Sequence, residues 1–270
     1  MPKLVEPVIA DPDDIEAQIE CFKAHGYVIL PDLLSPDEVD TLNDAIDRDR
    51  ETNPFMWFSG TAPDYNCNLL LTEPAFEMTI RHERLLPLIG NLMGGPICFE
   101  ELAVRHRDGE DEAHDTGWHR DRGYWPDHPL NLDYPQVIYY LNDVNETTHC
   151  FSISPEPAGG EILDDKDAHL ERGGILHFYG SAGSAILFNC ATLHGVTLRK
   201  TEKVRRTIQV YYGHPDRRSL SEVTLMPPSL WREHPDPEVR RFYSKFNRYT
   251  RVMMDGLSMT DDREHSLPNL

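Results

Sequence analysis

The sequence has few basic residues and no long apolar run. Its 270 residues include 26 Lys and Arg against 46 Asp and Glu, which gives a formal net charge of −20. A nucleic-acid-binding protein needs clustered Lys and Arg to contact phosphates, so this balance argues against one. No stretch reaches the roughly 18 apolar residues of a membrane-spanning helix, and no basic segment followed by an apolar one opens the chain. We therefore expect a soluble, cytoplasmic protein that binds neither nucleic acid nor membrane.

Cysteine is scarce and shows no pairing pattern. The five cysteines are widely spaced, and no C-x-x-C occurs: Cys21, Cys67, Cys98, Cys150 and Cys190. This spacing indicates neither a disulfide framework nor a structural zinc site, so we expect each cysteine to be a small buried side chain. The H-E-x-x-H motif is also absent, which leaves a zinc hydrolase as a weak alternative.

The apolar pattern predicts a helical first third and a β-rich middle. Apolar positions at helical spacing, a glycine at 26 and the Ser35-Pro36 start signal predict early helices. The predicted helices are 12–25, a helix from 36, 74–81 and 83–93. Runs rich in Val, Ile, Tyr and Phe predict strands at 27–30, 97–106, 135–144, 184–190 and 204–213. Residues 155–183 form a long polar segment, which we expect to be a lid or a mobile excursion.

Long polar loops between the strands are typical of an antiparallel sandwich or barrel. Hydrophobic residues make up 39% of the chain, enough for a sizeable core. We expect one domain over 1–270. It comprises a helical flank at 12–96, a β core at 97–213, and a C-terminal extension at 214–270, with a helix over 236–254 and a frayed tail.

Thirteen histidines raise the possibility of a metal site. His-x-Asp occurs four times, whereas composition alone produces about two such acidic pairs, so the motif alone is weak evidence. In a strand its two side chains share a face. Two copies have an intervening proline, and His106 adjoins a turn signal. His119-Arg120-Asp121 is the best candidate, because aromatic residues flank it; His106 is the candidate to retest.

A second histidine and an arginine complete the pattern. His194 follows an apolar strand and a small-residue turn, and a glycine comes after it. Arg205 lies eleven residues further on, with Thr207 on the same face of the predicted strand. A guanidinium beside a hydroxyl suits a carboxylate. Together these parts are much less probable by chance than any one of them.

These residues resemble the phytanoyl-CoA dioxygenase family of iron(II)- and 2-oxoglutarate-dependent oxygenases. The family's opening resembles FKAHGYVILP at 22–31 with LSPDEV at 34–39, its W-H-x-D resembles residues 118–121, and its distal histidine and arginine match His194 and Arg205. The resemblance covers 22–213. One departure is that residues 148–157 replace the family's glycine-rich P-G-S-H stretch.

The resemblance implies a mainly β fold with flanking helices, whose core is a double-stranded β-helix of the jelly-roll or cupin-like kind. It implies that His119, Asp121 and His194 bind Fe(II), while Arg205, helped by Thr207, binds 2-oxoglutarate. A 2-His-1-carboxylate triad leaves three octahedral positions for the keto acid and O2. Because Asp121 is present, hydroxylation of a small organic metabolite with release of succinate and CO2 is expected rather than halogenation.

Two questions stay open at this stage. A non-catalytic jelly-roll protein that binds a metal or acts as a scaffold is the alternative function, although the retained Arg205 argues against it. Arg105 and Arg107 could meet an anionic substrate, but pairing with the acidic residues of the loop over 107–116 is favoured. The identity of the substrate and the oligomeric state are not readable from the sequence.

Overall fold

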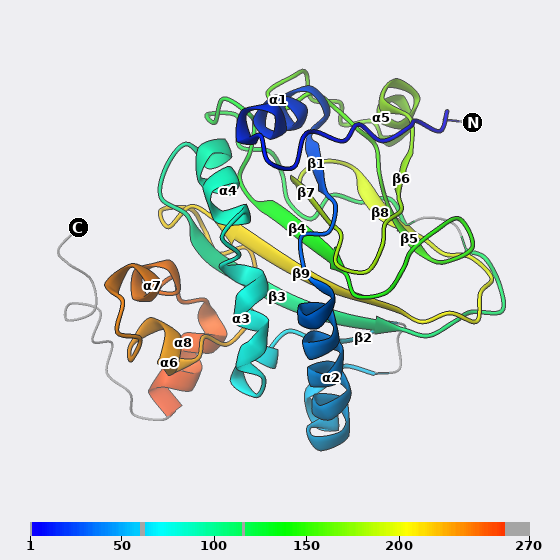
Figure 1. The fold of residues 1–270 in the computed structure, drawn as a ribbon. Coiled ribbons are helices and arrows are strands. Elements are labelled where there is room, and N and C mark those ends of the chain that lie inside the picture. The colour runs from blue at the N-terminus through cyan, green and yellow to red at the C-terminus, as the bar shows by residue number, and fades with distance from the viewer. Residues whose placement is uncertain (1, 60–62, 115–116, 257–270) are drawn as a thin grey trace.

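Two antiparallel sheets form the centre of the molecule (Figure 1). The computed structural model describes residues 2–59, 63–114 and 117–256. Within them, the large sheet has the strand order β1-β7-β4-β9-β3-β2, and the small sheet has the order β6-β5-β8. The strands are β1 Tyr27–Leu30, β2 Asp64–Asn66, β3 Cys98–Arg107, β4 Pro135–Tyr140, β5 Cys150–Ile153, β6 Leu176–Phe178, β7 Ala185–Asn189, β8 His194–Thr197 and β9 Arg205–Gly213.

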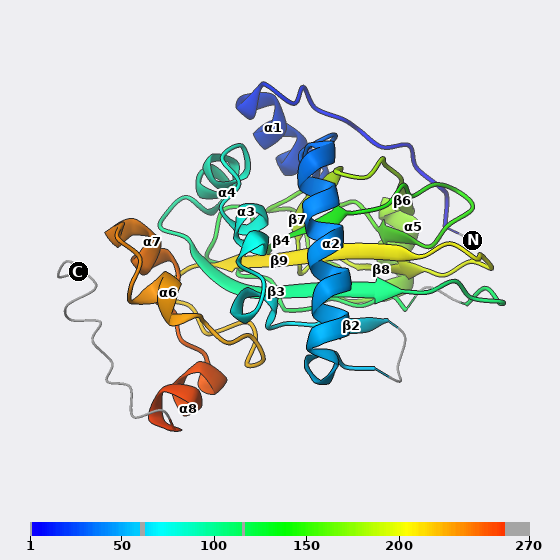
Figure 2. The same cartoon turned by 60° about the horizontal axis from the view of Figure 1, so that its bottom comes forward.

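Helices cover the outer face of the large sheet and one end of the molecule (Figure 2). The α-helices are α1 Ile15–His25, α2 Pro36–Thr52, α3 Glu77–Ile80, α4 Leu85–Met93, α5 Lys166–Gly173, α6 Pro228–Trp231, α7 Pro237–Phe242 and α8 Arg248–Gly256. Short 3-10 turns occupy Pro54–Met56, Leu69–Leu71 and Pro74–Phe76. Helix α2 runs across the outer face of the large sheet, whereas α5 lies near the small sheet (Figure 2).

Alternation along the strands divides the core into two layers. On the central strand β9, Ile208, Val210 and Tyr212 pack with the helices. Residues of the opposite face pack between the sheets: Ile138 of β4 and Phe188 of β7 join Phe151 of the small sheet. Because neighbouring residues of a strand point to opposite faces, β9 places Arg205, Thr207, Gln209 and Tyr211 on the inner face.

Local signals explain the well-predicted helices. Ser35 caps α2 with a complete capping box in which Glu38 bonds back to the Ser35 backbone. Gly26 ends α1 at φ 75°, a left-handed conformation that glycine adopts without a Cβ clash. The strands predicted at 27–30, 97–106, 184–190 and 204–213 are confirmed to within one residue at each end.

Several predictions on the fold need correction. The strand predicted to end at residue 144 ends at Tyr140. The segment 155–183, expected to be a lid or a mobile excursion, contains secondary structure that was not predicted, namely α5 and the sheet strand β6. The predicted helix over 236–254 is two helices, α7 and α8. The predicted frayed tail lies outside the described residues.

The fold class is the expected one: a β core of two antiparallel sheets with flanking helices. In the described ranges, no helix combines the length and apolar character needed to cross a bilayer. The five cysteines are all buried and unpaired, as predicted.

Candidate metal centre and cosubstrate site

Three ligand-type side chains converge at one end of the small sheet. One donor atom each from His119, Asp121 and His194 lies within 4.8 Å of the other two. The Nε2 atom of His119 is 3.4 Å from Oδ1 of Asp121, and Nε2 of His194 is 3.6 Å from Oδ2. Adjacent octahedral donors at metal bonds of about 2.1 Å lie about 3 Å apart, so a small closure lets these three share one ion. The described part of the chain contains no other such group of three His, Cys, Asp or Glu residues.

Backbone pairing holds the two histidines against each other. His119 and His194 form an antiparallel bridge with reciprocal N–H to carbonyl bonds of 2.9 Å, at the edge of β8. Their ring centroids are 4.5 Å apart. The Asp121 N–H donates to the Cys190 carbonyl at 3.0 Å, in the turn that precedes β8. Ligands 73 or more residues apart are therefore fixed by main-chain bonds.

The outer ring nitrogens set the orientation of both imidazoles. The Nδ1 of His119 is 2.7 Å from the Gly117 carbonyl, and the Nδ1 of His194 is 2.8 Å from the Thr192 carbonyl. Since a carbonyl only accepts, each Nδ1 carries the hydrogen, an assignment made from this bonding pattern. Each Nε2 then has its lone pair directed toward the cluster, as metal-ligating histidines require.

Burial and neighbouring charges set the pKa values of the three donor side chains. Burial lowers the pKa of His194 to about 4, so this imidazole is neutral near pH 7. Asp121 raises the pKa of His119, whose side chain is half-exposed. Burial tends to raise the pKa of Asp121, but the two histidines and Tyr211 outweigh it and lower that pKa. The Tyr211 hydroxyl donates to Oδ2 of Asp121 at 2.8 Å.

Arg205 and Thr207 lie on the same face of β9 as Tyr211. Both are buried, and Nε and Nη2 of Arg205 and the Thr207 hydroxyl have no hydrogen-bond partner. The Arg205 guanidinium lies over the ring of Tyr140, 5.4 Å from its centroid, in the space between the sheets. Leaving buried donors unpaired costs about 1–3 kcal/mol each. A carboxylate that accepts from them removes this cost, so this pair fits the far carboxylate of 2-oxoglutarate.

An open pocket of about 500 Å³ adjoins the metal-binding cluster. Asp121 and Tyr211 form part of its wall. The other lining residues come from β3, the loop after Asp121 and the loop after β9: Glu101, Arg105, Arg122, Arg218, Ser219, Leu220, Ser221 and Glu222. Lys245 fixes the last of these loops, because its ammonium donates to the carbonyls of His214 at 2.9 Å and Arg218 at 3.1 Å. The volume suits a compact organic molecule.

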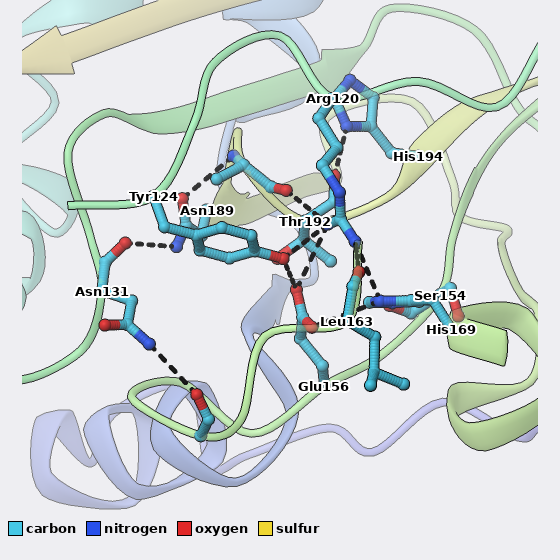
Figure 3. A network of polar contacts seen from close by, with 12 residues as sticks. Arg120, Tyr124, Asn131, Ser154, Glu156, Leu163, His169, Asn189, Thr192 and His194 are labelled. Atoms are coloured by element: carbon cyan, nitrogen blue, oxygen red, sulfur yellow. Dashed lines mark hydrogen bonds and ion pairs between the residues drawn. The ribbon is translucent and has the colours of Figure 1, made fainter. Parts of the chain in front are cut away.

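A network of polar contacts centred on Arg120 lies next to His194 (Figure 3). Arg120 lies between His119 and Asp121 in the chain, but its guanidinium bonds to residues outside the metal-binding cluster. Its guanidinium donates to the Tyr124 hydroxyl at 2.5 Å, the Ala191 carbonyl at 2.6 Å, the Leu163 carbonyl at 3.0 Å and Nδ1 of His169 at 3.1 Å. One side chain therefore links the loop of the proximal ligands to the turn before His194.

Glu156 is the buried acid of this network (Figure 3). The Tyr124 hydroxyl donates to Glu156 at 2.5 Å. The Glu156 carboxylate lies 3.6 Å from the Arg120 guanidinium and 3.4 Å from that of Arg172. Its side chain is only 7% exposed, so these cations offset the cost of burying its charge.

The other histidine candidates lie away from the metal-binding cluster. His106 bonds to Asp108 at 3.2 Å and accepts from Arg206 at 3.1 Å, on the helix-covered side of the large sheet. Arg107 pairs with Glu110, as expected, whereas Arg105 forms no ion pair with the described residues of that loop. Sequence reasoning missed the roles of Tyr211, Arg120 and Glu156. Only Tyr211 had a usable signal, because alternation from Thr207 places it on the same face.

Comparisons with known proteins agree with this geometry. The profile of the phytanoyl-CoA dioxygenase (PhyH) family matches residues 22–207. The ectoine dioxygenase of Halomonas elongata is 23% identical over 252 residues, covering 80% of this chain and 76% of that protein.

Solved structures share the fold. The epimerase SnoN in complex with Fe3+, alpha ketoglutarate and nogalamycin RO superposes with a TM-score of 0.61 at 21% identity, covering 76% of this chain and 85% of that one. EctD from S. alaskensis gives a TM-score of 0.62 at 18% identity, covering 83% and 86%. The double-stranded β-helix expected from the sequence is thus confirmed. The chain belongs to the phytanoyl-CoA dioxygenase (PhyH) family of iron(II)- and 2-oxoglutarate-dependent dioxygenases.

Proposed function

We propose that this dioxygenase hydroxylates a small organic molecule at an iron held by His119, Asp121 and His194. Arg205 and Thr207 would bind the far carboxylate of 2-oxoglutarate. The convergence of three donor atoms within 4.8 Å carries this proposal, because two neutral imidazoles and one carboxylate are the ligand set of such iron sites. The unpaired donors of Arg205 and Thr207 on the inner face of β9 support the cosubstrate part.

Bound iron and 2-oxoglutarate supply the oxidising chemistry, in which one O2 oxidises the keto acid to succinate and CO2 and converts a substrate C–H bond to C–OH. The protein's own groups bind and orient. Arg205 fixes the cosubstrate by a charge-assisted pair, which sets the direction from which its keto-acid end meets the metal. Tyr211 holds Asp121 through its hydroxyl bond, and the two Nδ1 to carbonyl bonds fix the imidazoles.

The five unpaired, buried cysteines support a cytoplasmic location, since a reducing compartment keeps thiols and Fe(II) in these states. We include that location in the proposal.

Anaerobic titration with Fe(II) and 2-oxoglutarate tests the site. The wild-type protein should give the weak visible metal-to-ligand band of the chelate, and then release succinate slowly in air without added substrate. In Arg205→Gln, half-maximal formation of the band should need about 10- to 100-fold more 2-oxoglutarate, since hydrogen bonds to charged groups contribute about 1.5–3 kcal/mol.

Arg206→Gln is the matched control, because Arg206 is adjacent on β9 but faces the helices and binds Asp47 at 3.1 Å. It should leave the 2-oxoglutarate requirement unchanged. A wild-type protein that folds, binds Fe(II) and yet forms no chelate band would contradict the proposal and favour a non-catalytic binding protein. Loss of iron binding in each of His119→Ala, Asp121→Ala and His194→Ala is also required.

A further inference from the structure

A second arginine with an unpaired donor faces the inner space of the large sheet. Arg105 on β3 is the cross-strand partner of Thr207 on β9, so the two side chains lie side by side on the inner face. Its Nε is buried and has no hydrogen-bond partner. The guanidinium lies over the ring of Tyr65, 5.9 Å from its centroid. Within the described residues, Arg105 forms no salt bridge with an acid.

The neighbouring charges do not account for Arg105. Arg107, two residues further along the same face, is paired with Glu110. Glu101 is the nearest acid on the same face of β3, and burial raises its pKa, although the Ser221 hydroxyl and Arg105 oppose that rise. Glu101 therefore lies in the same pocket as Arg105 without an ion pair between them. Both line the open pocket beside Asp121.

Arg105 and Arg205 lie on adjacent strands, and both have buried donors without a hydrogen-bond partner. Arg205 is assigned to 2-oxoglutarate by its position relative to His194, and its guanidinium lies over Tyr140. A bidentate pair with one guanidinium uses both oxygens of a carboxylate. Because Arg105 opens to the pocket that contains Asp121, its ligand would lie beside the metal rather than between the sheets.

We propose that Arg105 binds an acidic group of the molecule that is hydroxylated. The substrates would then be compact organic acids that also carry an amino, ammonium or hydroxyl group, which donates a hydrogen bond to Glu101. This inference rests on the proposed function. A planar guanidinium matches a carboxylate, and a pocket of about 500 Å³ accommodates a compact free acid. A carboxylate at Arg105 satisfies the unpaired Nε, and a donor at Glu101 offsets the burial of that acid.

A panel of small probes tests the substrate class. Amino acids and hydroxy acids are each compared with the matching carboxamide, which keeps the shape and removes the negative charge. The readouts are stimulation of succinate release over the level without substrate, and a shift of the chelate band on addition of the probe under anaerobic conditions. We expect acids to give both effects, and the matching amides to require about 10- to 100-fold higher concentrations.

Variants of Arg105 then link the effect to the residue. Arg105→Gln should raise the concentration of the active acid needed for half-maximal stimulation by about 10- to 100-fold, with Arg105→Lys intermediate. The 2-oxoglutarate concentration that forms the chelate band should stay unchanged in both. Arg84→Gln, at an exposed arginine near the start of α4, should leave both quantities unchanged.

The outcomes separate this inference from the proposed function. If the wild-type protein forms no chelate band, the proposed function fails. If the band forms but amides act as well as acids, or no acid stimulates turnover or shifts the band, the substrate inference is wrong. It is also wrong if Arg105→Gln weakens formation of the band as strongly as Arg205→Gln, because Arg105 would then belong to the cosubstrate site.

Discussion

Replacing Arg120 by methionine should lower both the stability of the metal-free protein and its affinity for a divalent metal. Arg120 is a positioning residue: its guanidinium bonds to the Ala191 and Leu163 carbonyls and lies beside the buried Glu156 carboxylate. Methionine keeps much of the apolar stem but removes the charge and every donor. The loop that carries His119 and Asp121 then loses its tie to the turn before His194.

The structure sets the size of the effect. Breaking a buried ion pair by removing one partner costs about 3–5 kcal/mol. Arg172 stays 3.4 Å from Glu156, but its side chain is 35% exposed, so its compensation is partial. We therefore expect a loss of about 3 kcal/mol in the free energy of unfolding. Substitution of a residue that orients metal ligands typically lowers metal affinity by about 10- to 100-fold, and we expect a decrease within that range for Arg120→Met.

Urea unfolding of the metal-free protein and titration with Co(II), followed by its visible absorption, measure the two effects. Arg172→Met is the matched control: it also removes a cation from Glu156, but the hydrogen bonds of Arg172 go to Glu156 and the Glu161 carbonyl rather than to the described residues of the ligand-bearing loops. Arg172→Met should lower stability without changing Co(II) affinity. In Arg120→Met/Glu156→Gln the stability loss should be smaller than the sum of the two single losses, because no unpaired carboxylate remains.

The reasoning would be refuted by equal Co(II) affinity in Arg120→Met and the wild-type protein, or by an equal loss of affinity in Arg172→Met. Strict additivity of the double variant would also contradict it.

Three further predictions concern the ligands and the backbone. Burial lowers the pKa of His194 to about 4, below its unfolded value, so the metal-free protein should lose up to about 3 kcal/mol of its free energy of unfolding as the pH falls from 6.5 to 4. Urea unfolding of the wild-type protein and of His194→Gln over that pH range measures this loss as the change in the difference between the two. A difference that does not change with pH would contradict the prediction. Tyr211→Phe removes the hydroxyl bond to Asp121 and should weaken Co(II) binding about tenfold, and unchanged affinity would show that this bond is irrelevant to the metal. Gly26→Ala should lower the free energy of unfolding by about 1–3 kcal/mol and with it the thermal midpoint, because φ at this position is +75° and the new Cβ would lie 2.7 Å from a carbonyl oxygen. Gly90→Ala in α4 is the control: the space around Gly90 is open, so this change should not lower the thermal midpoint.

Elements with strong local signals could be predicted from the sequence, whereas the three strands of the small sheet could not. The Ser35 cap and the Gly26 stop each depend on a few neighbouring residues, so α1 and α2 were readable. Strands β5, β6 and β8 have three or four residues each and are mostly buried on both faces. Such segments show no alternation of apolar and polar residues, and only pairing across the small sheet reveals them.

The site divides in a similar way. Metal and carboxylate chemistry restricts residue types, so His119, Asp121, His194 and Arg205 could be singled out, and the structure places the first three together. The ion pair between Arg120 and Glu156 joins residues 36 positions apart. It could not be predicted from spacing in the sequence, because the loops that carry these residues meet only in the folded chain. Only the structure distinguishes Arg105 from Arg107, because both lie on the same face of one strand. Arg107 pairs with Glu110, whereas the Nε of Arg105 has no hydrogen-bond partner.

The loop fastened by Lys245 has an evolutionary consequence. The family profile ends at residue 207, whereas the pocket wall at 218–222 lies beyond it and is attached through Lys245 to the C-terminal segment. The proposed metal ligands with Arg205 and much of the wall of the adjoining pocket are thus encoded in successive stretches of the gene. Exchange of the stretch for residues 214–256 between homologues should retarget the enzyme while the iron chemistry is inherited intact.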